Sequence, residues 1–100
     1  MISIVKAVRF GNGGQDVTHV EWGVIDEHDP REWVEQPQLA RAIDVVKAIK
    51  NGQTVRPLFE INGLLMIGEP LLVKMLPDGH ETIEMHQPYN ERTLMDIPKI

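Results

Sequence analysis

Histidine and glutamate residues recur near the C-terminal end of the chain in a pattern that could bind a metal ion. Glu84 and His86 lie on one face of a strand expected over residues 81–86, and His80, the residue just before this strand, continues the same alternation. Neutral imidazole and carboxylate groups both bind divalent metals, so these residues would serve a small metal-dependent enzyme. The alternative, a solvated polar face of a sheet, is favoured because no tight motif such as H-E-x-x-H is present. We therefore assign no catalytic residue, no metal ligand and no cofactor.

Acidic side chains form a second group between residues 26 and 37. The group includes Asp26, Glu27, Glu32 and Glu35, and Arg31 is its one cation. Two carboxylates in different environments can act as general acid and base, although a charged run of this kind is usually a solvated loop. A third interpretation is an acidic patch that meets a basic protein surface. Together with the net charge of -5, this patch suggests an alternative function, namely an acidic inhibitor or nucleic-acid mimic that binds a basic protein surface.

The composition of the chain argues against several other classes of protein. The ten Lys and Arg residues are scattered, and without a basic run we expect no binding to nucleic acid. The chain has no cysteine, which excludes disulfides and thiolate metal sites and favours the cytoplasm. The longest uncharged run, residues 61–68, is far shorter than the ~20 residues that span a bilayer. Residues 1–10 have no long apolar stretch and no small-residue cleavage site, so they predict a strand and not a signal peptide, and we expect a cytoplasmic bacterial protein without a membrane partner.

Strand patterns on both sides of one helical segment predict an α+β fold, and 100 residues suffice for a single domain. Residues 2–10 and 17–25 flank a glycine-rich turn and are expected to form an antiparallel hairpin. The residues expected on the core face of its second strand are Val20, Trp22 and Val24. Residues 31–34 are expected to add a short third strand in which Trp33 covers the core.

Further strands are expected over residues 54–61, 64–67, 71–76 and 81–86. Pro57 cannot donate a ladder hydrogen bond, so we expect its strand to lie at an edge or to be bulged. Asn62-Gly63 and Pro77-Asp78-Gly79 predict the turns that separate these strands. Residues 87–100 are expected to form a tail that docks on the domain or is partly flexible.

The helix is expected over residues 37–51. Apolar residues recur at helical spacing on one face, namely Leu39, Ala42, Ile43, Val46 and Ile49. Pro37 suits a first helical turn, and Asn51-Gly52 suits a stop with positive φ. The expected fold is an antiparallel sheet of about five to six strands, in the order ββ(β)αβββ, with this helix packed on one face.

Leu64, Leu65, Met66 and Ile67 form an apolar run that such a sheet would leave partly uncovered. One helix covers only one face of a sheet, so the other face or an edge is available to a second copy or to another protein. We therefore expect a non-enzymatic protein-interaction module that self-associates as a homodimer. The expected interaction surface comprises this apolar run and the acidic residues Asp26, Glu27, Glu32 and Glu35.

Three segments of the chain carry a family resemblance. They are the strand segment Val5-Lys6-Ala7-Val8-Arg9, the helix end Asn51-Gly52 and the closing segment Asn90-Glu91-Arg92-Thr93-Leu94-Met95-Asp96-Ile97-Pro98. Together they resemble a family of small bacterial proteins, the domain-of-unknown-function family numbered three-eight-nine-two. The resemblance implies no activity, no cofactor and no catalytic residue.

Overall fold

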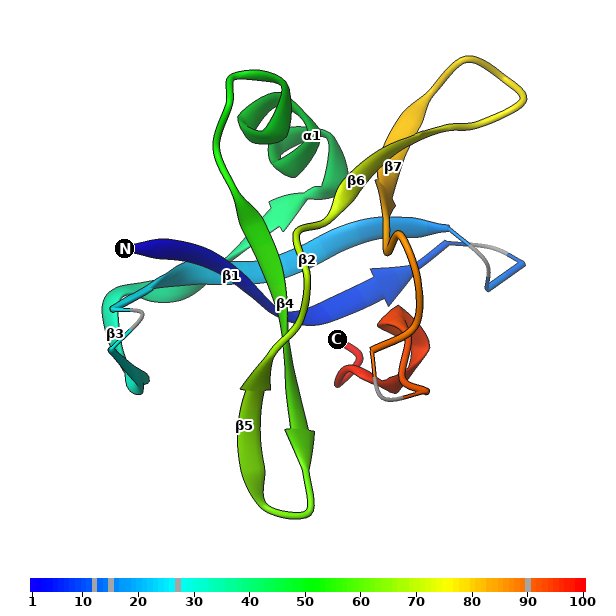
Figure 1. The fold of residues 1–100 in the computed structure, drawn as a ribbon. Helices are drawn as coiled ribbons and strands as arrows, with labels where there is room; N and C mark the ends of the chain where they lie inside the picture. The colour runs from blue at the N-terminus through cyan, green and yellow to red at the C-terminus, as the bar shows by residue number, and fades with distance from the viewer. Residues whose placement is uncertain (12, 15, 27, 90) are drawn as a thin grey trace.

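The structure, a computed structural model, describes residues 1–11, 13–14, 16–26, 28–89 and 91–100. Asn12 of the expected turn, Glu27 of the expected interaction surface and Asn90 of the family-like ending lie outside the described residues. The described part of the chain forms a five-stranded sheet, one α-helix and a separate two-stranded hairpin (Figure 1). The predicted α+β class with a single α-helix is confirmed.

The five-stranded sheet has the order β3-β2-β1-β4-β5. The expected antiparallel hairpin is confirmed, because β1 (Ile2–Phe10) pairs with β2 (Val17–Asp26). On the far side of β2 lies β3 (Asp29–Arg41), also antiparallel. On the other side of β1 lies β4 (Val55–Ile61), which runs parallel to β1 and pairs in turn with the antiparallel β5 (Leu64–Ile67). The sheet is therefore mixed, with one parallel pair among its antiparallel pairs, whereas the sequence predicted antiparallel pairing throughout and placed the last two strands in the same sheet.

The helix α1 (Ala42–Lys50) connects β3 to β4, two strands that run in the same direction. Parallel strands need a crossover connection, so α1 passes over β2 and β1 on one face of the sheet. The predicted stop is confirmed: the N–H of Asn51 donates to the Lys47 carbonyl at 3.0 Å, and Gly52 has a φ of 89°. No helix among the described residues is long and apolar enough to cross a membrane.

The predicted start of the helix at Pro37 is wrong, because residues 37–41 complete β3. Within this stretch Gln38 pairs with Trp22 and Ala40 pairs with Val20. The ladder of hydrogen bonds to β2 outweighs the local helical pattern, which is a weak signal beside tertiary pairing. Leu39, expected on the apolar face of the helix, is consequently 58% exposed on an edge strand.

Pro57 marks the position where β4 changes its partner. Val55, Arg56 and Pro57 pair with β1, whereas the following four residues pair with β5. Proline has no N–H to donate, so the ladder to β1 ends here. The expectation of an edge or bulged strand is wrong, since β4 lies between two strands. Beyond Pro57 the β4–β5 hairpin projects away from the other strands (Figure 1).

The C-terminal segment occupies the part of the β1 edge that β4 leaves. The N–H of Val8 donates to the Pro98 carbonyl and the Val8 carbonyl accepts from the Ile100 N–H, both at 3.0 Å. Upstream lies the 3₁₀-helix η1 (Leu94–Asp96), which is capped by the Thr93 hydroxyl. Leu94 and Ile97 are buried in the main core. The hydrogen bonds to Val8 and the burial of Leu94 and Ile97 together hold the end of the chain against the sheet.

The main core lies between the sheet, α1 and a hairpin of β6 (Leu72–Met75) and β7 (Glu81–Glu84). Val8 and Val20 from the sheet and Val45 from the helix are fully buried in this core. The helix face differs in detail from the prediction, because Val45 and Ala48 are buried whereas Ile43 and Ile49 are only partly buried.

The opposite face of the sheet is also covered at its centre. Ile4 and Ile25 on this face are fully buried. Trp33 pairs with Ile25, and its indole ring lies against Gly23 on the same face. The expectation that one face would stay bare is therefore not met at these positions, and uncovered apolar area has to be sought at the edges of the sheet.

Thr82 is a buried polar residue that joins β7 to β2, and its hydroxyl donates to the Val17 carbonyl at 2.6 Å. Thr82→Val keeps the shape of the side chain but removes this donor, so the free energy of unfolding should fall by ~1–2 kcal/mol. Urea denaturation followed by circular dichroism measures the change. The exposed Thr54 provides the control, and Thr54→Val should change stability by less than ~0.5 kcal/mol. Equal losses in the two variants would contradict the proposed role of the hydrogen bond.

Candidate functional site

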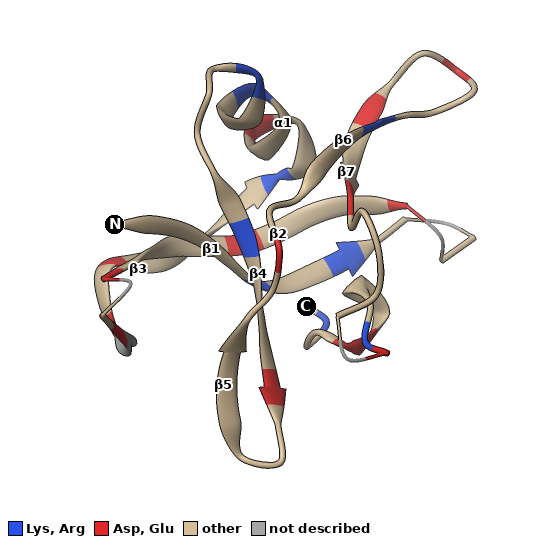
Figure 2. Cartoon of the chain, viewed as in Figure 1, with Lys and Arg blue, Asp and Glu red and all other residues tan. Residues whose placement is uncertain are grey.

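The edge strand β5 carries the predicted apolar run. Leu64 is 67% exposed and Leu65 is 40% exposed, whereas Met66 and Ile67 are partly buried. None of the four described residues of β5 is charged, as Figure 2 shows. Natural edge strands usually carry a charge, a proline or a bulge that prevents pairing with another chain. β5 has none of these features and is open to pairing.

The turn between β4 and β5 fixes which backbone groups face inward. Asn62 and Gly63 have φ values of 53° and 80°, as a two-residue hairpin turn of the primed type requires. The residues that flank such a turn form a hydrogen-bonded pair, here Ile61 and Leu64. The N–H and C=O groups of Leu64 therefore point toward β4.

The alternation of hydrogen-bonding direction along β5 leaves the backbone groups of two of its residues pointing outward. The N–H of Gly68 donates to the Pro57 carbonyl at 2.9 Å, so Gly68 also bonds inward. Inward and outward groups alternate along a strand, and the backbone groups of Leu65 and Ile67 consequently point away from β4. No described strand pairs with this outer edge of β5.

The two faces of the β4–β5 hairpin differ. Phe59 is 1% exposed and stacks on Tyr89 with ring centroids 5.8 Å apart, so its face of the hairpin packs on the C-terminal segment. Cross-strand pairing places Leu58 beside Ile67 and Glu60 beside Leu65 on the other face. That second face is apolar except for Glu60, and it adjoins the unpaired edge.

The predicted acidic residues lie at the opposite edge of the sheet, near the turn between β2 and β3. Asp26, Glu32 and Glu35 are all exposed, and Figure 2 shows acidic residues at this end of β3. Asp26 accepts a hydrogen bond from the N–H of His28 at 2.9 Å. Because β3 and β5 are the two outer strands, the structure does not join the acidic residues and the apolar run into one surface.

The histidine cluster is not assembled in the structure. His80 precedes β7, and its Nδ1 lies 2.9 Å from Oδ2 of Asp78. The N–H of His80 also donates to the Asp78 carboxylate, which lowers the pKa of Asp78. His86 lies beyond the end of β7, away from the strand that was expected to align it with Glu84. Across the described chain, no group of three His, Asp or Glu residues could hold a metal ion.

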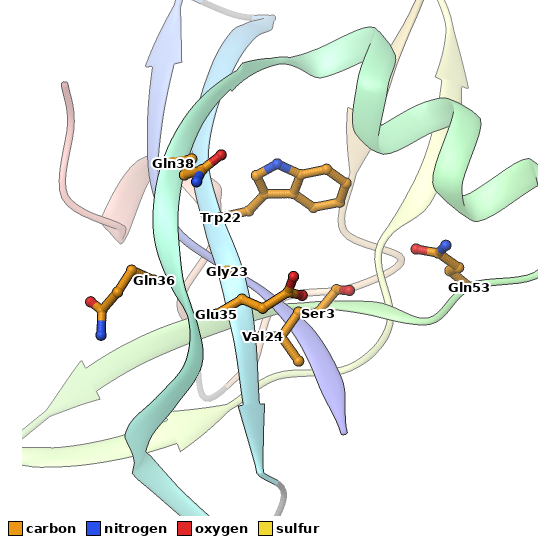
Figure 3. Close-up of a pocket in the computed structure, with 8 residues that line it drawn as sticks. All are labelled: Ser3, Trp22, Gly23, Val24, Glu35, Gln36, Gln38 and Gln53. Carbon is orange, nitrogen blue, oxygen red and sulfur yellow. The ribbon is translucent and has the colours of Figure 1, made fainter.

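A pocket of about 270 Å³ lies on the helix-bearing face of the sheet (Figure 3). Its lining residues are Ser3, Trp22, Gly23, Val24, Glu35, Gln36, Gln38 and Gln53. The sequence predicts a core position for Trp22, but its side chain is only partly buried and forms part of this pocket. Gln53 comes from the end of α1, where its N–H donates to the Ala48 carbonyl at 3.0 Å. The pocket therefore combines three strands with the helix terminus.

A β-bulge in β3 creates the polar wall of this pocket. Trp22 pairs with Gln38 and Val24 pairs with Glu35, so β3 has one more residue than β2 opposite Gly23. The extra residue places Glu35 and Gln38, three positions apart, on the same face as Trp22. Glycine within a strand pattern is the sequence signal that could have indicated this bulge.

Comparison of the chain with protein-family models, with curated proteins and with solved structures yields no match. The resemblance to the domain-of-unknown-function family stays a prediction.

The bulge depends on the absence of a side chain at Gly23. A Cβ atom there would lie 2.5 Å from the Glu35 carbonyl oxygen and 2.9 Å from Cε3 of Trp33. Gly23→Ala should therefore displace β3 and lower the free energy of unfolding by ~1–3 kcal/mol, the usual cost of overpacking. Thermal and urea denaturation measure the loss, and the indole signal of Trp22 should shift with it. An alanine variant as stable as the parent protein would refute the close approach.

Proposed function

We propose that this protein is a non-enzymatic protein-interaction module of the cytoplasm that self-associates through β5. The observation that carries the proposal is the outer edge of β5, where exposed leucines accompany backbone groups that point away from β4. Such an edge recruits a further strand, because main-chain hydrogen bonds supply affinity and apolar side chains are buried on pairing.

A second copy of the same strand fits this edge. In an antiparallel pair centred on a twofold axis at Met66, Leu65 of each copy lies opposite Ile67 of the other. Their outward N–H and C=O groups then bond to one another in both directions. The facing strands carry no charge, so pairing desolvates no ionised group on them. The apolar face that contains Leu58 and Ile67 would continue across the twofold axis.

The short strand limits the strength of the association. Each hydrogen bond contributes a net ~0.5–1.5 kcal/mol, and apolar burial contributes ~25 cal/mol per Å². Loss of rotational and translational freedom opposes both terms. We therefore expect a reversible dimer with a dissociation constant of about 10–100 µM, in place of a permanent assembly.

Leu65→Lys places a charge on the outer edge of β5, where it should oppose strand pairing without disturbing the ladder to β4. Sedimentation velocity over ~5–500 µM should show a monomer–dimer equilibrium for the parent protein and an at least ~10-fold weaker association for this variant. Leu39→Lys is the matched control, because Leu39 is 58% exposed on the opposite edge strand β3.

Two results would contradict self-association through β5. The parent protein could stay monomeric across the whole concentration range, or the two lysine variants could weaken the dimer equally. Association that survives Leu65→Lys and weakens with added salt would indicate instead a charged contact, such as the acidic end of β3 provides.

A further inference from the structure

The pocket beside Trp22 is lined by polar side chains without partners. Ser3, Glu35, Gln38 and Gln53 all line it. In the part of the chain that the structure describes, their side chains form no hydrogen bond and no ion pair. Hydroxyl, carboxylate and carboxamide groups together offer both donors and acceptors. Glu35, Gln38 and Gln53 are exposed and Ser3 is partly buried, so these groups are available to a polar ligand in exchange for water.

The arrangement of these groups defines a floor and a rim. Figure 3 shows the indole ring of Trp22 between Gln38 and Gln53, with the oxygen atoms of Glu35 and Ser3 toward the other side of the cavity. Gln36 belongs to the lining, but its side chain points away from this group. A ligand on the indole face would therefore have polar groups along more than one of its edges.

Charge excludes anionic ligands. Among the residues that the structure describes, no Lys or Arg lines the pocket, and Glu35 is the one acidic side chain of the lining. A phosphate or carboxylate group would meet the Glu35 carboxylate without a compensating cation, which raises the cost of desolvating both. The ligand is consequently neutral or cationic.

We propose that this pocket binds one neutral pyranose ring of a saccharide. The flat indole of Trp22 can stack on the apolar C–H face of the ring, and vicinal hydroxyl groups can bond in pairs to the Glu35 carboxylate and the Gln38 carboxamide. A cavity of about 270 Å³ lies just below the ~300–1,000 Å³ typical of sites for drug-sized molecules and suits one ring. An apolar ligand would leave the rim unpaired, and a quaternary ammonium ion would use only Trp22 and Glu35.

This binding site goes beyond self-association and does not depend on it. The pocket lies on β1, β2 and β3, whereas the proposed dimer forms through β5 at the opposite edge of the sheet. Two copies paired through β5 would each keep one open pocket. Leu65→Lys should therefore leave saccharide binding unchanged, so failure of one proposal is distinguishable from failure of the other.

Titration of the ¹⁵N-labelled full chain with glucose, galactose, mannose and N-acetylglucosamine tests the proposal. At least one of these sugars should shift the indole N–H signal of Trp22, assigned with Trp22→Phe, with a dissociation constant on the order of 1–10 mM. The indole signal of Trp33, which lies on the other face of the sheet, should stay in place. Glu35→Gln and Gln38→Ala should each weaken binding by ~5–10-fold.

Glu32→Gln is the matched control for Glu35→Gln, because Glu32 is exposed on the same strand and is not among the residues that line the pocket. Its affinity for the sugar should equal that of the parent protein. Absence of any shift up to ~100 mM sugar would overturn the proposal. Tighter binding of choline or of glucose 6-phosphate than of every neutral sugar would also overturn it, and so would equal losses in Glu32→Gln and Glu35→Gln.

Discussion

The edge of β1 that faces away from β2 is shared by two segments, and the rest of the architecture depends on how they divide it. β4 pairs with the first half of this edge and stops at Pro57, which has no N–H for a ladder. The C-terminal segment then bonds to Val8. Because β4 must turn aside to make room, the β4–β5 hairpin leaves the sheet and exposes its outer edge (Figure 1). The unpaired outer edge of β5 is thus a consequence of the pairing of the C-terminal segment with β1.

Local sequence patterns predicted the elements that end at turn-forming residues. The first strand, the Asn62-Gly63 turn and the Asn51-Gly52 helix stop all have a glycine that marks a reversal with positive φ. The start of the helix could not be predicted in this way, since Leu39 fits a helical stripe and a strand equally well. Pairing with β2, which is distant in sequence, decided between them. The parallel pairing of β1 with β4 is likewise a long-range choice that no local pattern encodes.

The two candidate sites differ in how far the sequence could reveal them. The apolar run of β5 is continuous, so Leu64 and Leu65 could be singled out from residue type alone, and both are exposed. The pocket is assembled from four elements, and its polar wall depends on a register shift in β3. For Trp22 the sequence favours the core, because aromatic residues usually pack there. Only the bulge opposite Gly23 reveals that Glu35 shares its face.

The bonds between β1 and the C-terminal segment join the two ends of the chain, with Arg9 and Ile100 separated by 91 positions. Closing a loop of that length costs chain entropy before any contact is gained, and contacts so distant in sequence slow folding. We therefore expect the C-terminal segment to fill its half of the β1 edge only after the more local strand pairs have formed. Until then, the unpaired backbone groups of β1 can bond to an extended segment of another chain. Slow docking of the C-terminal segment would therefore favour aggregation.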